Sequence, residues 1–225
     1  MINSILRRVF PVLAKWLINC RLLGYQYGQV KSIREKKPID KDGKPIPWYT
    51  YPALEYLNQF DFSEKNLFEF GSGNSSLYWA SRVNTVVSVE SDPQWYSHVK
   101  NSLQSNQKLF LRQDEEGHIS CLKEQGVKFD IIAIDGNWRR HCGRRAVDYL
   151  KSDGIIILDN SDWYPNTAAE LRTSGFFQIN FSGFGPINDY TWTTSIFIRR
   201  FSNLQKNFTN VLPIGGINQF GSDDQ

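Results

Sequence analysis

The stretch from Leu67 to Ala80, LFEFGSGNSSLYWA, constrains the fold more than any other part of the chain. Its mainly apolar beginning predicts a buried strand, Gly71 and Gly73 predict a sharp turn, and the polar residues that follow predict the start of a helix. A strand that ends in glycines and enters a helix exposes backbone N–H groups to a ligand. The stretch therefore predicts a nucleotide-type site.

The residues around this turn discriminate between nucleotide classes. A dinucleotide fingerprint requires a third glycine where the chain has Ser76, and no lysine stands at the spacing of a phosphate-binding P-loop. Glu90 closes the next apolar run, about 20 residues after Gly71, and a carboxylate at that distance accepts the hydroxyl groups of a ribose. The pattern predicts an adenosine ligand without a pyrophosphate.

Apolar runs and helical segments alternate along the rest of the chain. We expect strands at 66–71, 85–90, 108–112, 129–135, 154–159, 176–182 and 193–200, and helices at 75–82, 93–104, 117–125, 139–151 and 165–174. This alternation predicts an α/β fold in which helices cover both faces of a parallel sheet.

Several motifs then resemble one family. FEFGSGNSS followed by VVSVESD is similar to motifs I and II of class I S-adenosylmethionine-dependent methyltransferases, and LRQDEE, FDIIAIDG and GIIILDNSD continue the resemblance over about residues 45–200. The resemblance implies a Rossmann-like, doubly wound and mostly parallel seven-stranded sheet with an antiparallel last strand. It also implies S-adenosylmethionine as the cofactor.

The resemblance assigns cofactor roles to residues near the ends of the strands. Glu69 would orient the ammonium group of the cofactor directly or through water, and Glu90 would bind the ribose. Asp114 would meet the adenine amino group. The remaining predicted cofactor residues are Gly71 and Gly73, against which the methionine part would lie, together with Ser75 and Asp135.

Asp135, Asp159 and Asn160 follow the fourth and fifth predicted strands. Their oxygens suit Mg²⁺ or another divalent cation, and the arrangement resembles the metal triad of catechol-type and caffeoyl-CoA-type O-methyltransferases. Such an ion would lower the pKa of a substrate hydroxyl. In the alternative, metal-free site, Asp135, Asp159 or His141 is the catalytic base. The basic stretch that starts at Arg139 departs from the metal-dependent pattern, and both alternatives stay open.

The acceptor is predicted from weaker features. PWYTYPALEYL and FSGFGPINDYTWTTSIF are similar to bacterial methyltransferases of glycan biosynthesis, which implies O-methylation of a small molecule or a glycan. Arg139 and Arg140 would meet an anionic substrate, Trp48 and Tyr190 are candidate contacts, and His98 is interpreted as structural. The alternatives are an RNA or protein methyltransferase, or a non-catalytic protein that binds adenosine or is tethered to a membrane.

Charge is unevenly distributed, although the formal net charge is only +3. Residues 1–40 contain eight basic and two acidic side chains, so the remainder carries a net charge of −3. A balanced body with a basic N-terminal segment does not predict a nucleic-acid partner. Three widely spaced cysteines predict neither disulfides nor a zinc site, and a reducing cytoplasm is the expected location.

The two ends of the chain lie outside the expected methyltransferase domain, residues 45–200. Residues 2–20 carry apolar side chains at helical spacing opposite basic ones, which predicts an amphipathic helix interrupted at Pro11. Residues 1–24 could contact the inner membrane face peripherally, but we expect this helix to pack on the domain. The N-terminal unit would end in a linker at 31–44, and residues 201–225 are predicted to be a flexible tail.

Overall fold

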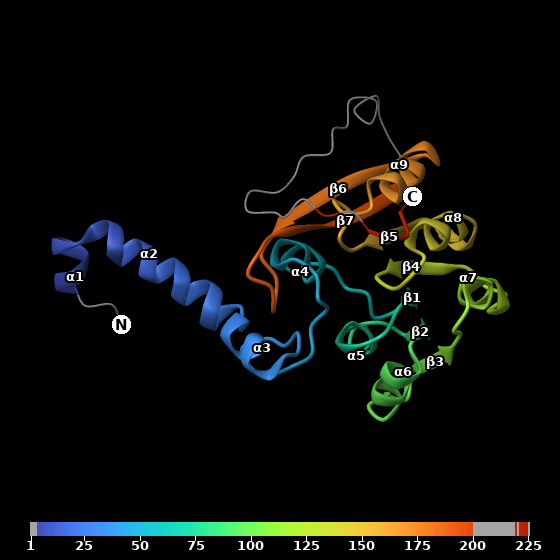
Figure 1. The fold of residues 1–225 in the computed structure, drawn as a ribbon, viewed down its shortest axis with the longest axis horizontal. Coiled ribbons are helices and arrows are strands. Elements are labelled where there is room, and N and C mark those ends of the chain that lie inside the picture. The colour runs from blue at the N-terminus through green and yellow to red at the C-terminus, as the bar shows by residue number, and fades with distance from the viewer. Residues whose placement is uncertain (1–3, 200–218, 220, 225) are drawn as a thin grey trace.

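The computed structural model describes residues 4–199, 219 and 221–224, with the side chains described from residue 7 onward. Its core is a seven-stranded sheet in the order β3-β2-β1-β4-β5-β7-β6 (Figure 1). The strands are β1 Asn66–Phe70, β2 Thr85–Glu90, β3 Gln107–Leu111, β4 Phe129–Ile134, β5 Leu150–Leu158, β6 Phe176–Gly183 and β7 Trp192–Arg199.

The direction of the strands confirms the predicted fold class. β1 pairs in parallel with β2 and β4, whereas β7 runs antiparallel to both β5 and β6. β5 begins four residues before its predicted start at 154, because Leu150 already pairs with Phe129 ahead of a register shift. The sheet is therefore the Rossmann-like, mostly parallel sheet that the sequence predicts.

Helices cover both faces of the sheet because successive side chains of each strand point to opposite sides. Phe68, Phe70 and Ile132 pack in the core on one face, while Leu67 and Ile131 pack in the core on the other. The first face is covered by α7 Glu115–Glu124, α8 Arg139–Tyr149 and α9 Pro165–Thr173, and the second by α4 Tyr51–Leu57 and α5 Asn74–Ala80. A further helix, α6 Pro93–Lys100, follows β2.

The predicted glycine turn joins β1 to α5. Gly71 adopts a φ of 108°, and a Cβ atom there would lie 3.2 Å from the carbonyl carbon and oxygen of Asp135. A side chain at this position would therefore conflict with both the backbone conformation and the close approach of the β4 end. Gly73 then precedes α5, and its N–H donates to Ser76 Oγ at 3.1 Å.

The N-terminal helical segment differs from the expectation. It consists of α1 Ser4–Val9, α2 Pro11–Arg21 and the π-helix η1 Leu22–Gln26, which we call the N-terminal arm, followed by α3 Gln29–Glu35. The break before Pro11 confirms the predicted interruption. However, α2 stands clear of the sheet (Figure 1), and Val12 and Trp16 are 81% and 59% exposed, so the expected packing on the domain is wrong.

The segments predicted as a linker and a tail are partly folded. Residues 31–35 belong to α3, and the buried Ser32 hydroxyl donates to the carbonyl oxygen of Ile39 at 2.6 Å. The Asp224 carboxylate accepts from Thr167 Oγ1 at 2.8 Å, which places residues 221–224 against the start of α9. Residues 201–218, 220 and 225 of the predicted tail lie outside the described residues. Among the described helices, none has the length and apolar character needed to cross a bilayer.

Candidate functional site

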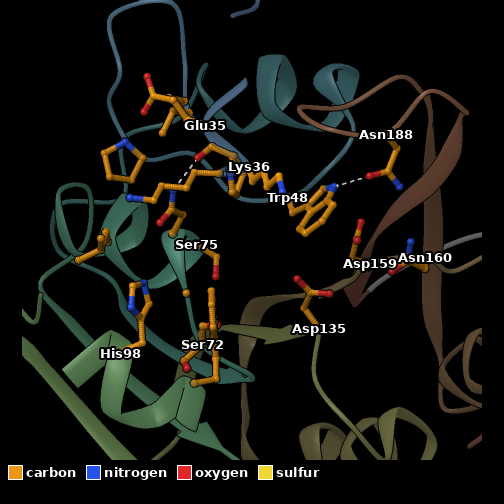
Figure 2. A pocket seen from close by; sticks show the side chains of 18 of the residues that line it. Glu35, Lys36, Trp48, Ser72, Ser75, His98, Asp135, Asp159, Asn160 and Asn188 are labelled. Carbon is orange, nitrogen blue, oxygen red and sulfur yellow. Dashed lines mark hydrogen bonds between the residues drawn. The ribbon is translucent and has the colours of Figure 1, made fainter. Parts of the chain in front are cut away.

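A cavity of about 770 Å³ opens at the carboxyl ends of the central strands (Figure 2). This location follows from the topology, because the strand order reverses between β1 and β4 and leaves a crevice at that edge. One wall comes from the turn after β1, with Ser72, Gly73 and Ser75, and the opposite wall from Asp135, Asp159 and Asn160 after β4 and β5. The glycine turn, Asp135 and Asp159 therefore border the same cavity.

Glu90 lies behind the first wall. Its carboxylate accepts hydrogen bonds from Ser72 Oγ at 2.8 Å and from the backbone N–H groups of Ser91 and Asp92 at 2.8 and 3.0 Å. These three donors fix the orientation of the Glu90 carboxylate. Glu90 is hydrogen-bonded to Ser72, and Ser72 lines the cavity. Glu90 therefore lies close behind the cavity wall, at the end of β2, where the sequence predicts a ribose contact.

Glu69 is fully buried beneath the glycine turn. Ser76 and Ser88 donate hydrogen bonds to its Oε2 atom, whereas Oε1 has no hydrogen-bond partner among the described residues. Burial raises the pKa of Glu69 to about 7, although the neighbouring serine hydroxyls, including that of Ser75, oppose this shift. Glu69 does not line the cavity, and its contact with the cofactor ammonium group stays a prediction.

The wall beside the glycine turn contains an aromatic pair that the sequence analysis missed. Trp95 Nε1 donates to the Ser72 carbonyl oxygen at 2.7 Å, and its ring stacks on His98 with centroids 5.2 Å apart. Both line the cavity, so His98 borders the candidate site. A signal was present, because α6 begins directly after the β2 edge and is capped by Asp92, which places its first turns beside the crevice.

Arg139 occupies the position in which the sequence predicts a metal ion. Its guanidinium group donates to Asp135 Oδ1 at 3.0 Å, to Asn160 Oδ1 at 3.1 Å and to the Asp159 carbonyl oxygen at 2.5 Å. The residue is only 9% exposed. These partners are internal, but Arg139 also lines the cavity, and its contact with an anionic substrate stays a prediction. Arg140 instead pairs with Glu170 at the surface.

This arrangement does not fit the predicted divalent-cation site. Asp159 Oδ1 accepts from Trp192 Nε1 at 3.1 Å and from Thr194 Oγ1 at 2.5 Å, so it is already committed. Asp135 and Asn160 direct oxygens at Arg139. Within residues 4–199, 219 and 221–224, no cluster of His, Cys, Asp and Glu suited to a metal ion is found. A guanidinium cation, held by hydrogen bonds, neutralises the carboxylates instead.

The two aspartates differ in their access to the cavity. The Asp135 side chain is 23% exposed, whereas Asp159 is 3% exposed. Burial raises the pKa of both, and Arg139 opposes this effect in each case; Asp135 further raises the pKa of Asp159. Asp135 is thus the carboxylate that can meet a bound molecule, and Asp159 is held within the wall.

Two predicted site residues lie away from this cavity. His141 is exposed and its Nδ1 pairs with Glu115 of α7. It follows Arg139 by two residues, which places it on the far side of α8, so it is not the base for this cavity. Asp114 is exposed and caps α7 by accepting the Gly117 N–H at 2.8 Å. It does not line the cavity, and its adenine contact stays a prediction.

The remaining side of the cavity combines the N-terminal segment with the loop before β7. Trp48 Nε1 donates to Asn188 Oδ1 at 3.0 Å, as Figure 2 shows, and Gln29 Nε2 donates to the Gly185 carbonyl oxygen at 3.0 Å. Asn74 Nδ2 donates to the Pro38 carbonyl oxygen at 2.8 Å and fixes the segment against α5. Residues 35–39 therefore form part of the wall and not a plain linker.

Comparisons with known proteins add information on the fold. No protein-family model matches the chain, and no curated protein matches it. The chain is similar to three solved structures. A precorrin-6y C5,15-methyltransferase from Geobacter metallireducens has 14% sequence identity and a TM-score of 0.53, over 66% of this chain and 87% of that chain. A candidate methyltransferase from Streptococcus mutans in complex with SAH has 12% identity and a TM-score of 0.51, over 65% of this chain and 95% of that chain, and an rRNA methylase from Streptococcus thermophilus has 14% identity and a TM-score of 0.50, over 66% and 95% of the two chains. At these identities the likeness establishes a shared Rossmann-like fold.

Proposed function

We propose that the protein is an S-adenosylmethionine-dependent methyltransferase that acts on an oxygen atom of a small molecule or a glycan. The observation that carries this proposal is that the glycine turn and Asp135 border one cavity at the reversal point of the sheet, with Glu90 hydrogen-bonded to the cavity residue Ser72. The likeness in fold to solved methyltransferases supports it.

The residues of the first wall fit this cofactor. Beneath this wall, the buried Glu69 has an oxygen without a partner among the described residues, and it would orient a ligand ammonium group directly or through water. Three hydrogen bonds orient the Glu90 carboxylate, to which ribose hydroxyls would donate. Gly73 borders the cavity without a side chain, beside the Trp95 ring. When bound, S-adenosylmethionine supplies an electrophilic methyl group.

The opposite wall would handle the proton of the acceptor. Asp135 is the accessible carboxylate, and we infer that it accepts the proton of an acceptor hydroxyl. Arg139 would hold the Asp135 carboxylate in place through their 3.0 Å ion pair. Its positive charge would balance the negative charge of Asp135 once Asp135 has released the accepted proton to solvent. Asp159 would fix the orientation of Trp192 and Thr194 and not touch the acceptor. Positioning of the acceptor in a partly closed cavity would supply much of the rate.

Aromatic side chains support a sugar-like or planar acceptor. Trp48, Trp163 and Tyr190 line the cavity, and the rings of Trp163 and Tyr190 lie 6.1 Å apart. Flat apolar rings with polar edges suit the apolar faces and hydroxyl groups of sugars. The Trp48 to Asn188 hydrogen bond joins this region to the loop before β7, so the acceptor would be held between both segments.

The test is transfer of a radiolabelled methyl group from S-adenosylmethionine to separate lysate fractions of small molecules and glycans, RNA, and protein. We expect label in the first fraction, and loss of at least a hundredfold of the rate in Asp135→Asn. Asp148→Asn, an exposed aspartate of α8, is the matched control. Label in RNA or protein alone would refute the acceptor class, and cofactor binding without transfer to any fraction would favour the non-catalytic alternative.

A further inference from the structure

The N-terminal arm is an apolar surface without a partner in the described part of the chain. Among the described residues, most of the exposed large apolar side chains lie between positions 9 and 33. Within α2, Val12 and Trp16 stand four residues apart and share a helix face with Leu13. These side chains are 81%, 59% and 45% exposed, so the arm presents a continuous apolar stripe to its surroundings.

The charge of the arm indicates what covers this stripe. No aspartate or glutamate occurs before Glu35, whereas the same stretch contains Arg7, Arg8, Lys15, Arg21, Lys31 and Arg34. A protein surface with an apolar stripe, flanking cations and no anion is complementary to a bilayer that contains anionic lipids. Trp16 and Tyr25, both exposed, have amphipathic rings that suit the boundary between headgroups and acyl chains.

A second feature lies where the arm meets α3. A cavity of about 240 Å³ is lined by Tyr25, Lys31, Arg34 and Lys41, with Glu35 as its acidic member. Lys41 pairs with Asp42 at 2.8 Å, which leaves Lys31 and Arg34 to attract an anion. A cavity of this size and charge suits the phosphate of a lipid headgroup, at the base of the apolar stripe.

We propose that the N-terminal arm binds the surface of a bilayer rich in anionic lipid, with its apolar stripe in the interface and its cations at the headgroups. This proposal does not rest on methyl transfer. The arm continues through α3 into residues 35–39, which wall the main cavity. Membrane binding would therefore hold that cavity near the membrane surface.

The test is co-sedimentation of the full-length protein with vesicles of phosphatidylcholine alone and of phosphatidylcholine mixed with phosphatidylglycerol. We expect pelleting with the mixed vesicles, little with the neutral ones, and release by salt. Val12→Ser combined with Trp16→Ser lowers the partition coefficient about tenfold or more, because apolar burial is lost. Arg8→Gln combined with Lys15→Gln lowers it by a similar factor for anionic vesicles.

Matched controls lie on the body of the protein. Val127→Ser removes an apolar side chain that is 56% exposed, and Lys123→Gln combined with Lys128→Gln removes two exposed cations. These variants should pellet like the unmodified protein, and all variants should keep its unfolding temperature. Equal pelleting of the arm variants, or no pelleting with mixed vesicles, would overturn the proposal. A dimer in light scattering that Val12→Ser with Trp16→Ser converts to a monomer would do so too, because a second copy would then cover the stripe.

Discussion

Replacement of Arg139 by methionine removes the internal cation and keeps a side chain of similar length. In the structure, Asp135 and Arg139 form a 3.0 Å ion pair whose side chains are 23% and 10% exposed. Removal of one partner from such a pair leaves an uncompensated charge and costs about 3 to 5 kcal/mol. We take the lower end of this range, about 3 kcal/mol at neutral pH, because Asp135 borders the cavity and water can reach it.

The assay is urea unfolding of the two proteins at pH 7.5 and at pH 5. The deficit of Arg139→Met should shrink at the lower pH, because burial already raises the pKa of Asp135 and loss of the guanidinium raises it further. Protonation then removes the unpaired charge. Arg139→Lys should recover part of the stability, since one ammonium group cannot reach all three acceptors. A loss below about 1 kcal/mol, or a deficit unchanged by pH, would refute Arg139 as the counter-ion.

Three further predictions concern individual site residues. Glu90→Ala should weaken the binding of S-adenosylhomocysteine by about 1 to 3 kcal/mol, because hydrogen bonds to the carboxylate are lost. Unchanged affinity in calorimetry would remove the ribose assignment. The control is Glu64→Ala, which replaces an exposed glutamate. Burial raises the pKa of Glu69 from 4.5 to about 7, so the folded state retains a proton that the unfolded chain releases, and stability should fall by about 2 to 3 kcal/mol between pH 5 and pH 8. Glu69→Gln should abolish this slope, and an identical slope in denaturant titrations would contradict the assignment. His141→Ala should leave methyl transfer within about twofold, because His141 faces Glu115; a loss of about a hundredfold would restore it as the base.

The parts of the fold that the sequence predicted correctly are those fixed by local patterns. The runs at β1, β2 and β4 are mainly apolar because both faces of these strands are buried, and the glycines at 71 and 73 have conformations that the turn requires. These features depend on neighbouring residues. They could therefore be predicted without knowledge of the tertiary structure.

The remaining features depend on residues that are distant in the sequence. The orientation of Arg139 toward Asn160 follows from how α8 sits over the ends of β4 and β5, and the arginine-rich stretch DGNWRRHCGRR does not reveal which arginine faces inward. Residues 31–44 have the composition of a linker. Ser32 and Ile39 are nevertheless buried, and a hydrogen bond joins them across the intervening loop. The amphipathic spacing of α2 was recognised, but periodicity identifies an apolar face and not what covers it.

The central claim is that the cavity binds S-adenosylmethionine through residues of the chain alone. Calorimetric titration of S-adenosylhomocysteine into the purified protein, in EDTA and again in Mg²⁺, tests it most directly. We predict binding at one site with the same affinity in both buffers, because Arg139 already neutralises the carboxylates. Absence of binding in both buffers would contradict the claim, since the glycine turn would then be only a connection between β1 and α5.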